Sequence, residues 1–402
     1  MKMLVEHIRM LKARGHTCIA VHRSDTATRA MPPWTTVEAN VDVVCKLHER
    51  LNDIYPVHEL DVVVVGIFHQ VPELMAGVTA PVLYWEQGHE WLFGDPVRFQ
   101  LQHNYLQQDQ LFHKVMKLPV ALIAVSRAVQ SILAHEFGRH ALIIPNDIDC
   151  ERFCPGPRAL YPPDKVLLTT PGQKPRQFAA HSILLVGNPA LPLKGFDVAA
   201  SVLVAVSKVL PLSVTWICQS QPEARQVPAL INSGLTINLY ISPPQDRLPA
   251  LYRGHDALLF TSRYEAWGMP VLEAMASGLA VVATNCLGLS TFATHGVDCL
   301  IAEPRDVLGL ARNLVMVLTD VKLRERLQVA ARSAAVRFSP TAVASRLEML
   351  LYSLSACSRE LLQLRQSCAD DVQLACTWAS QTCCRSAAKA SAQPGQADER
   401  KA

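Results

Sequence analysis

Residues 264–283 read Y-E-A-W-G-M-P-V-L-E-A-M-A-S-G-L-A-V-V-A, and this stretch decides the fold. Pro270 suits the first position of a helix and Gly278 suits its exit, so the stretch predicts a helix of about two turns. Gly268 allows the backbone to approach a ligand closely, and the amides at a helix N-terminus bind anions. The stretch therefore predicts a binding site for the diphosphate of a sugar nucleotide.

Two carboxylates, Glu265 and Glu273, flank this helix start. The segment E-A-W-G-M-P-V-L-E-A-M-A-S-G resembles the E-x7-E segment of retaining glycosyltransferase family 4. The resemblance implies that Glu265 contacts the donor sugar or its phosphates and that Glu273 accepts hydrogen bonds from the ribose hydroxyls. It also places Trp267, Gly268 and Met269 in the donor site. A solvated carboxylate pair beside an ordinary core helix is the alternative, and the flanking glycines and proline favour the sugar nucleotide.

Short Val/Ile/Leu runs alternate with amphipathic stretches along the chain, which is typical of parallel sheets with helices on both faces. In a first series, strands are expected at 17–22, 61–66, 81–85, 121–126 and 141–146. In a second series, strands are expected at 182–187, 213–218, 236–241, 257–262, 280–284 and 299–302. Leu4, Ile8 and Leu11 mark the apolar stripe of an opening helix that Gly15 would end.

The resemblance covers about residues 1–352 and implies the α/β GT-B architecture, in which two Rossmann-like doubly wound domains face a cleft. The chain starts directly at the first helix, so the N-terminal domain is expected to lack its first strand and glycine-rich loop. The expected parts are an acceptor-side domain (1–153), a linker too rich in Pro and Gly for regular elements (154–178) and a donor-binding domain (179–340). A helix packing back on the first domain (341–355) and a flexible Cys-containing tail (356–402) are expected to follow.

A second motif, S-I-L-L-V-G-N-P-A-L-P-L-K-G, spans 182–195. The family places an arginine after the glycine and a lysine before the last glycine, and these two cations neutralise the leaving diphosphate. Gly187 and Lys194 match that pattern and are assigned to the donor site, with Lys194 as a catalytic residue. Asn188 stands at the arginine position, where it donates hydrogen bonds but brings no charge. Arg263 could supply that charge or be an ordinary surface residue.

In the first domain, the run P-V-L-Y-W-E-Q-G-H-E-W-L-F-G-D at 81–95 follows a strand with polar groups among aromatics. Its candidates are His89, Glu86 and Glu90. Family enzymes place a histidine after this strand to contact the transferred sugar, which assigns His89 a catalytic role. The alternative is a structural histidine beside Trp91 whose ring nitrogens are hydrogen-bonded within the protein.

The segment H-A-L-I-I-P-N-D-I-D at 140–149 resembles the family's run at the exit from the first domain. Asp147 stands where the family has glycine, and Asp147 and Asp149 spell D-x-D, which binds a metal in another glycosyltransferase class. At a domain exit Asn146 and Asp149 are better explained as turn or cap formers. No metal site is predicted.

Composition excludes several classes of protein. Half of the 402 residues are hydrophobic and the net charge is +3, too small to indicate a nucleic-acid partner. No apolar run approaches the roughly 20 residues that span a bilayer, and the N-terminus lacks a signal-peptide core. The 12 cysteines include no C-x2-C pair, so neither zinc nor disulfides are expected. We expect a cytoplasmic protein.

Together these features predict a retaining, metal-independent hexosyltransferase of polysaccharide or glycolipid biosynthesis. It would need no cofactor, since the nucleotide sugar is a substrate, and its acceptor would be a saccharide or glycolipid. By analogy with family members, the resemblance adds peripheral contact with the inner membrane face. The main alternative is a non-catalytic GT-B module that binds a nucleotide sugar or a partner enzyme, which Asn188 and the missing loop favour. A sugar-nucleotide epimerase of the same fold fits the glutamate segment less well.

Overall fold

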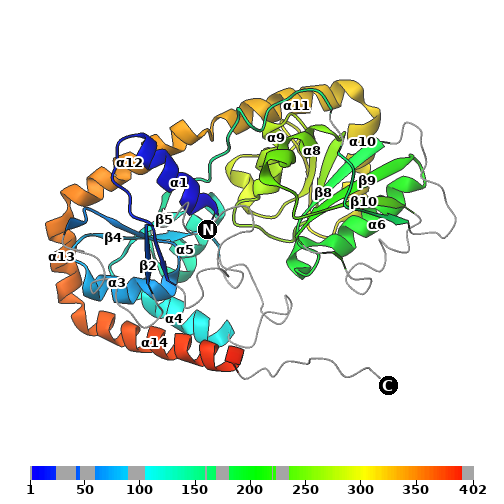
Figure 1. Cartoon of the computed structure of the whole chain (residues 1–402). Helices are drawn as coiled ribbons and strands as arrows, with labels where there is room; N and C mark the ends of the chain where they lie inside the picture. The colour runs from blue at the N-terminus through cyan, green and yellow to red at the C-terminus, as the bar shows by residue number, and fades with distance from the viewer. Residues whose placement is uncertain are drawn as a thin grey trace, which may run out of the picture.

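A computed structural model gives the fold of the chain (Figure 1). The structure describes residues 2–23, 42–45, 59–88, 105–158, 161–168, 181–219, 221–222 and 235–391. Two α/β units lie side by side, and the long C-terminal helices run from the second unit back along the first (Figure 1).

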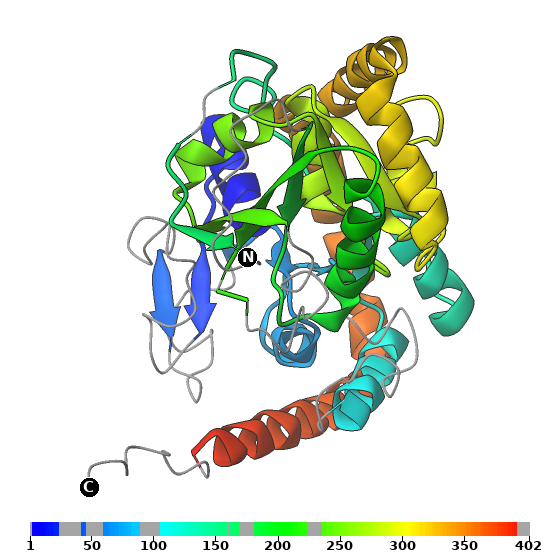
Figure 2. The same ribbon diagram turned by 90° about the vertical axis from the view of Figure 1, so that its right-hand side faces the viewer.

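The first unit is built on a parallel sheet in the order β3-β4-β5-β6. Its strands are β3 (Val63–Val65), β4 (Val82–Glu86), β5 (Ala121–Ala124) and β6 (Leu142–Ile143). Its helices are α1 (Lys2–Ala13), η3 (Phe68–Gln70), α3 (Val71–Gly77), α4 (Tyr105–Lys117) and α5 (Arg127–Phe137). A separate parallel pair, β1 (Val21–Arg23) and β2 (Val43–Cys45), stands beside them (Figure 2).

The opening helix is confirmed, and Gly15 follows its end with a positive φ of 92°. Its buried face differs in part from the predicted stripe, because Leu11 is buried whereas Leu4 and Ile8 are only partly so. His7 is buried instead, and its ring stacks on Trp85 at 4.5 Å between centroids. The helix therefore covers β4 with an aromatic contact that apolar periodicity does not reveal.

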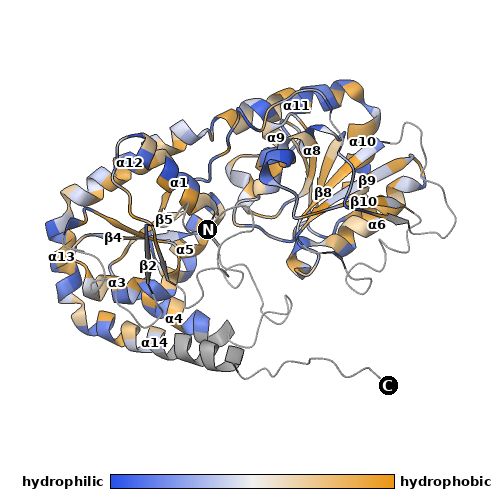
Figure 3. Ribbon diagram, in the orientation of Figure 1, coloured by the Kyte–Doolittle hydropathy of each residue, from blue (hydrophilic) through white to orange (hydrophobic). Residues whose placement is uncertain are grey.

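The second unit carries a seven-stranded sheet in the order β13-β12-β11-β8-β9-β10-β7. Its strands are β7 (Lys165–Leu168), β8 (His181–Val186), β9 (Leu212–Cys218), β10 (Thr236–Ile241), β11 (Ala257–Phe260), β12 (Ala280–Thr284) and β13 (Leu300–Ala302). Its helices are η5 (Pro192–Lys194), α6 (Phe196–Ser207), η6 (Gln245–Arg247), α8 (Leu248–Arg253), α9 (Met269–Ala276), η7 (Gly288–Thr291) and α10 (Val307–Thr319). All six strands expected in the second series are confirmed. Every residue of β11 and β12 is buried, because helices cover both faces. Figure 3 shows hydrophobic residues on the strands inside this unit.

The predicted linker does contain a regular element, so that part of the prediction is wrong. Strand β7 lies inside 154–178 and pairs antiparallel with β10, Thr236 opposite Leu168. Pro162 and Pro163 precede the strand and thus remove no ladder hydrogen bond, and an edge position needs only one paired side.

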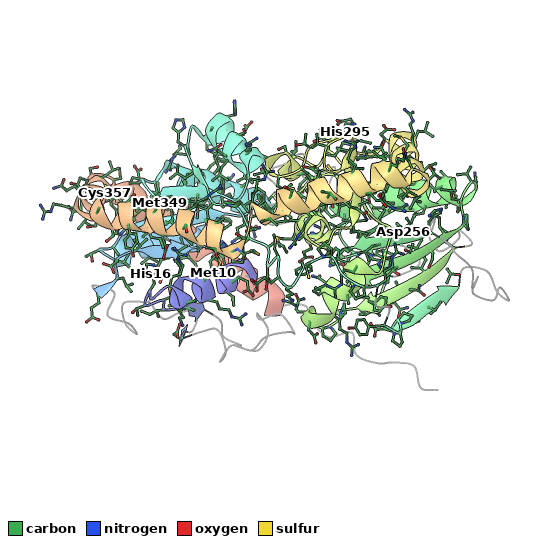
Figure 4. All side chains as sticks on the ribbon, turned by 90° about the horizontal axis from the view of Figure 1, so that it is seen from above. Met10, His16, Asp256, His295, Met349 and Cys357 are labelled. Atoms are coloured by element: carbon green, nitrogen blue, oxygen red, sulfur yellow. The ribbon has the colours of Figure 1, made fainter. Side chains whose placement is uncertain are left out.

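The chain closes with α11 (Val321–Val336), α12 (Pro340–Ala356), α13 (Ser358–Ser367) and α14 (Ala369–Ser391). Ser339 caps α12 by accepting from the Ala342 amide, as expected. Helix α12 does pack back on the first unit, because Glu348 pairs with both Arg14 at 2.5 Å and His16 at 2.8 Å. These two hydrogen bonds lower the pKa of Glu348 to about 2. In Figure 4, helix α12, labelled at Met349, lies alongside α1, labelled at Met10.

The prediction of a flexible tail after residue 355 is wrong up to residue 391. Helix α14 packs against α3 and α4, burying Val372, Ala375 and Ala379. Lys114 of α4 lies over the Trp378 ring, 4.4 Å from its centroid. A stripe made mostly of alanines has little hydrophobicity, which explains why its helical period was missed. Residues 392–402 lie outside the described part of the chain.

Candidate functional site

The N-terminus of α9 lies at the edge of the second sheet where the parallel strands end. Gly268 precedes the helix with φ of 98°, and a Cβ there would come within 2.6 Å of Leu289. The helix begins at Met269, one residue earlier than predicted, with Pro270 in its first turn. Gly278 follows its end at φ 72°, as predicted. Because first-turn amides have no acceptor within their helix, this terminus can bind an anion.

Lys194 and Glu265 form an ion pair beside this helix start. Lys194 Nζ lies 2.6 Å from Glu265 Oε1, and Ser262 Oγ donates to the same oxygen at 2.9 Å. The two side chains are 23% and 15% exposed, so a ligand can reach both of them. They meet because β8 and β11 are neighbours in the sheet and each is followed by one of the two residues. Burial, reinforced by the Glu265 charge, raises the pKa of the neighbouring Cys286 thiol above its ordinary value.

The backbone of Glu265 is held by the loop that leads into η7. The Gly288 amide donates to the Glu265 carbonyl at 3.0 Å, and a Cβ on Gly288 would lie 2.6 Å from the Ala266 carbonyl. The same loop touches the first unit, because the Arg127 amide at the start of α5 donates to Thr291 Oγ1 at 3.0 Å. The candidate site therefore lies next to the first unit.

Glu273 lies in the middle of α9 and is only 6% exposed. Tyr252 OH donates to its Oε2 at 2.7 Å. Burial and then the Glu273 charge raise the pKa of Tyr252 well above its ordinary value, so the phenol stays protonated and keeps donating. The second carboxylate is thus held rigidly within the unit.

Gly187 and Asn188 shape the turn after β8. Gly187 has a φ of 149°, and its carbonyl accepts from Trp216 Nε1 at 3.2 Å. Asn188 Oδ1 accepts from the Ala190 amide at 3.0 Å, and its Nδ2 donates to Gln219 at 3.4 Å. Asn188 therefore stabilises its own turn, and its contact with a donor stays a prediction.

Trp267 and Met269 face the protein interior. The Trp267 side chain is 3% exposed and packs between Phe292 and Phe338, with ring centroids at 4.9 and 5.4 Å. Met269 is partly buried against the same core. Any contact of Trp267 with a donor would therefore come from its backbone.

The predicted residues of the first unit are only partly described. His89 and Glu90 lie outside the described residues, so the role of His89 stays a prediction. Glu86 is fully buried at the end of β4, where it accepts from Tyr84 OH and, at 2.6 Å, from the Gly88 amide. Glu86 thus shapes the turn that follows β4.

The D-x-D sequence separates into two structural roles. Asp149 accepts from the amides of the next turn, including Glu151 at 3.0 Å, which confirms it as a turn former. Asp147 is buried, and its carboxylate lies 3.3 Å from His7 Nε2 of α1. The residue in place of the family's glycine therefore links the domain exit to the opening helix.

Sequence reasoning missed Tyr252 and Arg332, which support the site, and left the role of Arg263 open. Tyr252 holds Glu273, Arg263 holds the loop that carries Lys194, and Arg332 of α11 donates to the Ala276 carbonyl at the end of α9 at 2.7 Å. Each acts on a main-chain carbonyl or a distant carboxylate. Neither kind of partner leaves a local pattern in the sequence.

Residues 180–320 match the family model described as Glycosyl transferases group 1. A D-inositol 3-phosphate glycosyltransferase from Xylanimonas cellulosilytica is 28% identical over 225 residues, which make up 54% of this chain and 53% of that protein. A mannosylfructose-phosphate synthase from Agrobacterium fabrum is 35% identical over 105 residues, 26% of this chain and 23% of that protein. The chain spans about half or less of the length of the curated relatives it matches.

Two solved structures match most of the chain. Sucrose-phosphate synthase from Thermosynechococcus elongatus has a TM-score of 0.67 at 16% identity and covers 88% of this chain and 92% of its own. HepE from Anabaena, in complex with UDP, has a TM-score of 0.66 at 17% identity, and the match covers 88% of this chain and 95% of HepE. At these identities the likeness shows the fold alone, and it confirms the two-domain GT-B architecture.

The helices in the described part of the chain include none with the length and apolar character needed to cross a bilayer.

Proposed function

We propose that this chain moves a sugar from a nucleotide-sugar donor to a saccharide or lipid-linked acceptor, because residues 180–320 match the family model described as Glycosyl transferases group 1. The observation that carries the proposal is the placement of Lys194 and Glu265 beside the N-terminus of α9. An ammonium group and free helix amides together form a site for a diphosphate. The structural neighbour HepE has been solved in complexes with UDP and with UDP-glucose, which supports a uridine nucleotide as one donor to test.

In this proposal the diphosphate lies over the first turn of α9 with Lys194 Nζ on its oxygens. Glu265, which now accepts from Lys194 and Ser262, would then face the sugar or phosphate end of the donor. Glu273 would accept hydrogen bonds from the ribose hydroxyls, and Tyr252 would keep its carboxylate fixed. Binding in this way uses no metal, since the cation and the amides supply the positive charge.

We propose retention of configuration at the transferred carbon. The bond between the sugar C1 and the diphosphate oxygen breaks, and a bond from C1 to the acceptor oxygen forms on the same face. The acceptor proton passes to the departing phosphate oxygen, so no protein nucleophile is needed. Lys194 and the α9 amides stabilise the negative charge that grows on the leaving group, which is where electrostatic catalysis is most effective.

A non-catalytic nucleotide-sugar-binding module is the second candidate. Asn188 favours it, because a neutral side chain engaged with Gln219 stands where a second cation is expected to assist the leaving group. Location in the cytoplasm, with peripheral contact at the inner membrane face, goes with the enzymatic proposal and rests on family analogy.

The test is calorimetric titration of the chain with UDP, GDP, ADP and dTDP, repeated on Glu273→Ala. Binding of one nucleotide that is lost in the variant supports the donor site and identifies the base. Folded protein that binds none of the four nucleotides contradicts the proposal. Release of the nucleoside diphosphate from the matching nucleotide sugar, measured with and without oligosaccharide acceptors, then distinguishes an enzyme from a binding module.

A further inference from the structure

Arg263 follows β11 and reaches across to the loop that carries Lys194. Its backbone amide donates to the Leu193 carbonyl at 2.7 Å. Its Nη1 donates to the Pro192 carbonyl, and its Nη2 lies 2.7 Å from Asp197 Oδ2 at the start of α6. The Arg263 side chain is only 16% exposed, so its guanidinium is committed to this loop rather than to solvent.

Thr261 continues the same attachment from the other side. Its Oγ1 donates to the carbonyls of Lys194 at 3.3 Å and Gly195 at 2.9 Å. A Cβ on Gly195 would lie 2.1 Å from the Thr261 carbonyl oxygen, so the loop and the strand exit are in direct contact. Thr261 and Arg263 therefore donate to four consecutive carbonyls, those of residues 192–195, which form the Lys194 loop.

The contacts at Arg263 require the shape of arginine. One guanidinium donates to a main-chain carbonyl and to a carboxylate in different directions, which the single ammonium of lysine cannot do in the same way. The η5 turn has no side-chain cap of its own, so this attachment sets where the turn sits on the sheet. Because Lys194 is the last residue of η5, the attachment also sets the position of its Nζ relative to Glu265.

We propose that Arg263 is a positioning residue for Lys194: it fixes the η5 loop so that the ammonium meets the donor diphosphate, and it does not contact the donor itself. The proposal rests on the donor site of the proposed function. It excludes the two roles that the sequence left open for Arg263, a compensating phosphate cation and an ordinary surface charge.

A double-mutant cycle tests this positioning role. The nucleoside diphosphate that binds best among UDP, GDP, ADP and dTDP is titrated into wild type, Arg263→Ala, Lys194→Ala and the double variant, and its parent nucleoside is titrated alongside. We expect Arg263→Ala to weaken diphosphate binding about tenfold and to leave the phosphate-free nucleoside unaffected. In the Lys194→Ala background the same change should alter affinity less than twofold, because coupled residues are non-additive.

Two further variants separate positioning from charge. Arg263→Lys keeps the positive charge but loses the branched guanidinium, so it should weaken diphosphate binding as much as Arg263→Ala does. Wild-type affinity in Arg263→Lys would instead indicate direct contact of residue 263 with phosphate. Asp197→Asn is a milder change to the same attachment and serves if Arg263→Ala fails to fold. Arg158→Ala is the control, since it removes another arginine–aspartate pair, 2.5 Å to Asp256, away from the loop.

The outcomes are distinguishable. The positioning role is overturned if Arg263→Ala weakens diphosphate binding by the same factor in the wild-type and Lys194→Ala backgrounds. It is also overturned if Arg263→Ala weakens nucleoside binding as much as diphosphate binding. Both results leave the donor site intact. Absence of diphosphate binding by wild type, or no effect of Lys194→Ala, overturns the proposed function and this inference with it.

Discussion

Lys194 Nζ and Glu265 Oε1 lie 2.6 Å apart although 71 positions separate the two residues in the chain. The pair forms where two neighbouring parallel strands end, next to a helix start that attracts anions. In the absence of a donor each charge thus neutralises the other. In the proposed donor site a bound diphosphate would share the Lys194 ammonium with Glu265.

Replacing Lys194 by alanine should weaken nucleoside diphosphate binding by at least about tenfold, since a charge-assisted contact is worth roughly 1.5–3 kcal/mol. The loss should be smaller for the nucleoside monophosphate and absent for the nucleoside. Titration calorimetry at two salt concentrations measures it, and the wild-type protein should show the steeper salt dependence. Lys208→Ala, an exposed lysine at the end of α6, is the control. Equal affinities for the Lys194 and Lys208 variants would contradict the assignment.

Replacing Tyr252 by phenylalanine removes the donor that holds Glu273 Oε2. A buried carboxylate that loses a hydrogen bond is destabilised, so the free energy of unfolding should fall by about 1–3 kcal/mol. Nucleotide affinity should fall as well, because the carboxylate is no longer fixed. Urea unfolding and titration with the preferred nucleotide measure the two effects. Tyr352→Phe, at an exposed tyrosine on α12, should change neither quantity.

Much of the second unit could be predicted because its strands are buried on both faces and therefore form continuous apolar runs. Helix α9 was predicted almost to the residue, since Gly268 and Pro270 are strong local signals. The assignment of both Lys194 and Glu265 to one donor site was a different kind of prediction. It depends on β8 lying beside β11, which no local pattern encodes, and it came from the family resemblance.

The features that sequence reasoning missed depend on long-range contacts. Strand β7 is a strand because the edge of β10 offers it a partner, and α14 is held by a stripe of small side chains. Trp267 was assigned to the donor site, and its side chain packs into the core, where Phe292 and Phe338 from distant segments meet it.

Replacing Gly195 by alanine should disrupt the Lys194 loop. Its φ is 66°, and the new Cβ would lie 2.1 Å from the Thr261 carbonyl oxygen, so backbone must shift. Gly138→Ala is a matched control, because Gly138 has a φ of 63° with nothing within 4 Å of the new Cβ. The control should cost only the left-handed strain of about 1–2 kcal/mol. Thermal unfolding should show a larger loss for Gly195→Ala, with weaker nucleotide binding in that variant alone; equal effects would count against the close contact.

His255 should make stability depend on pH. Burial lowers the pKa of His255 to about 4, while its Nδ1 lies 2.6 Å from the Leu251 carbonyl. Between about pH 4 and 6.5 the unfolded chain binds a proton that the folded chain does not, so stability falls as the pH is lowered through this window. The slope is at most about 1.4 kcal/mol per pH unit. Urea unfolding of wild type and His255→Asn at pH 7 and pH 5 should show a smaller pH effect in the variant; parallel curves would contradict the assignment.

Arg365 should anchor the C-terminal helices on the first unit. Its guanidinium is buried and donates to three main-chain carbonyls around the end of α3, those of Met75, Val78 and Ala80. Burial lowers the pKa of Arg365, because the charged guanidinium loses contact with water. Replacing Arg365 by methionine keeps the apolar stem but leaves those carbonyls without their donor, so unfolding free energy should fall by about 3 kcal/mol or more. Arg359→Met, an exposed arginine on the same helix, should stay within about 0.5 kcal/mol of wild type.

The same pair of variants separates anchoring from general stability. If Arg365 ties α13 and α14 to the first unit, hydrogen exchange in Arg365→Met should speed up at residues 71–80 and 369–379 while α9 keeps its protection. Nucleotide affinity should stay at the wild-type value, because α9 and the Lys194 loop belong to the other unit. Uniform acceleration across both units would show that the two units unfold together and that Arg365 is not a local anchor.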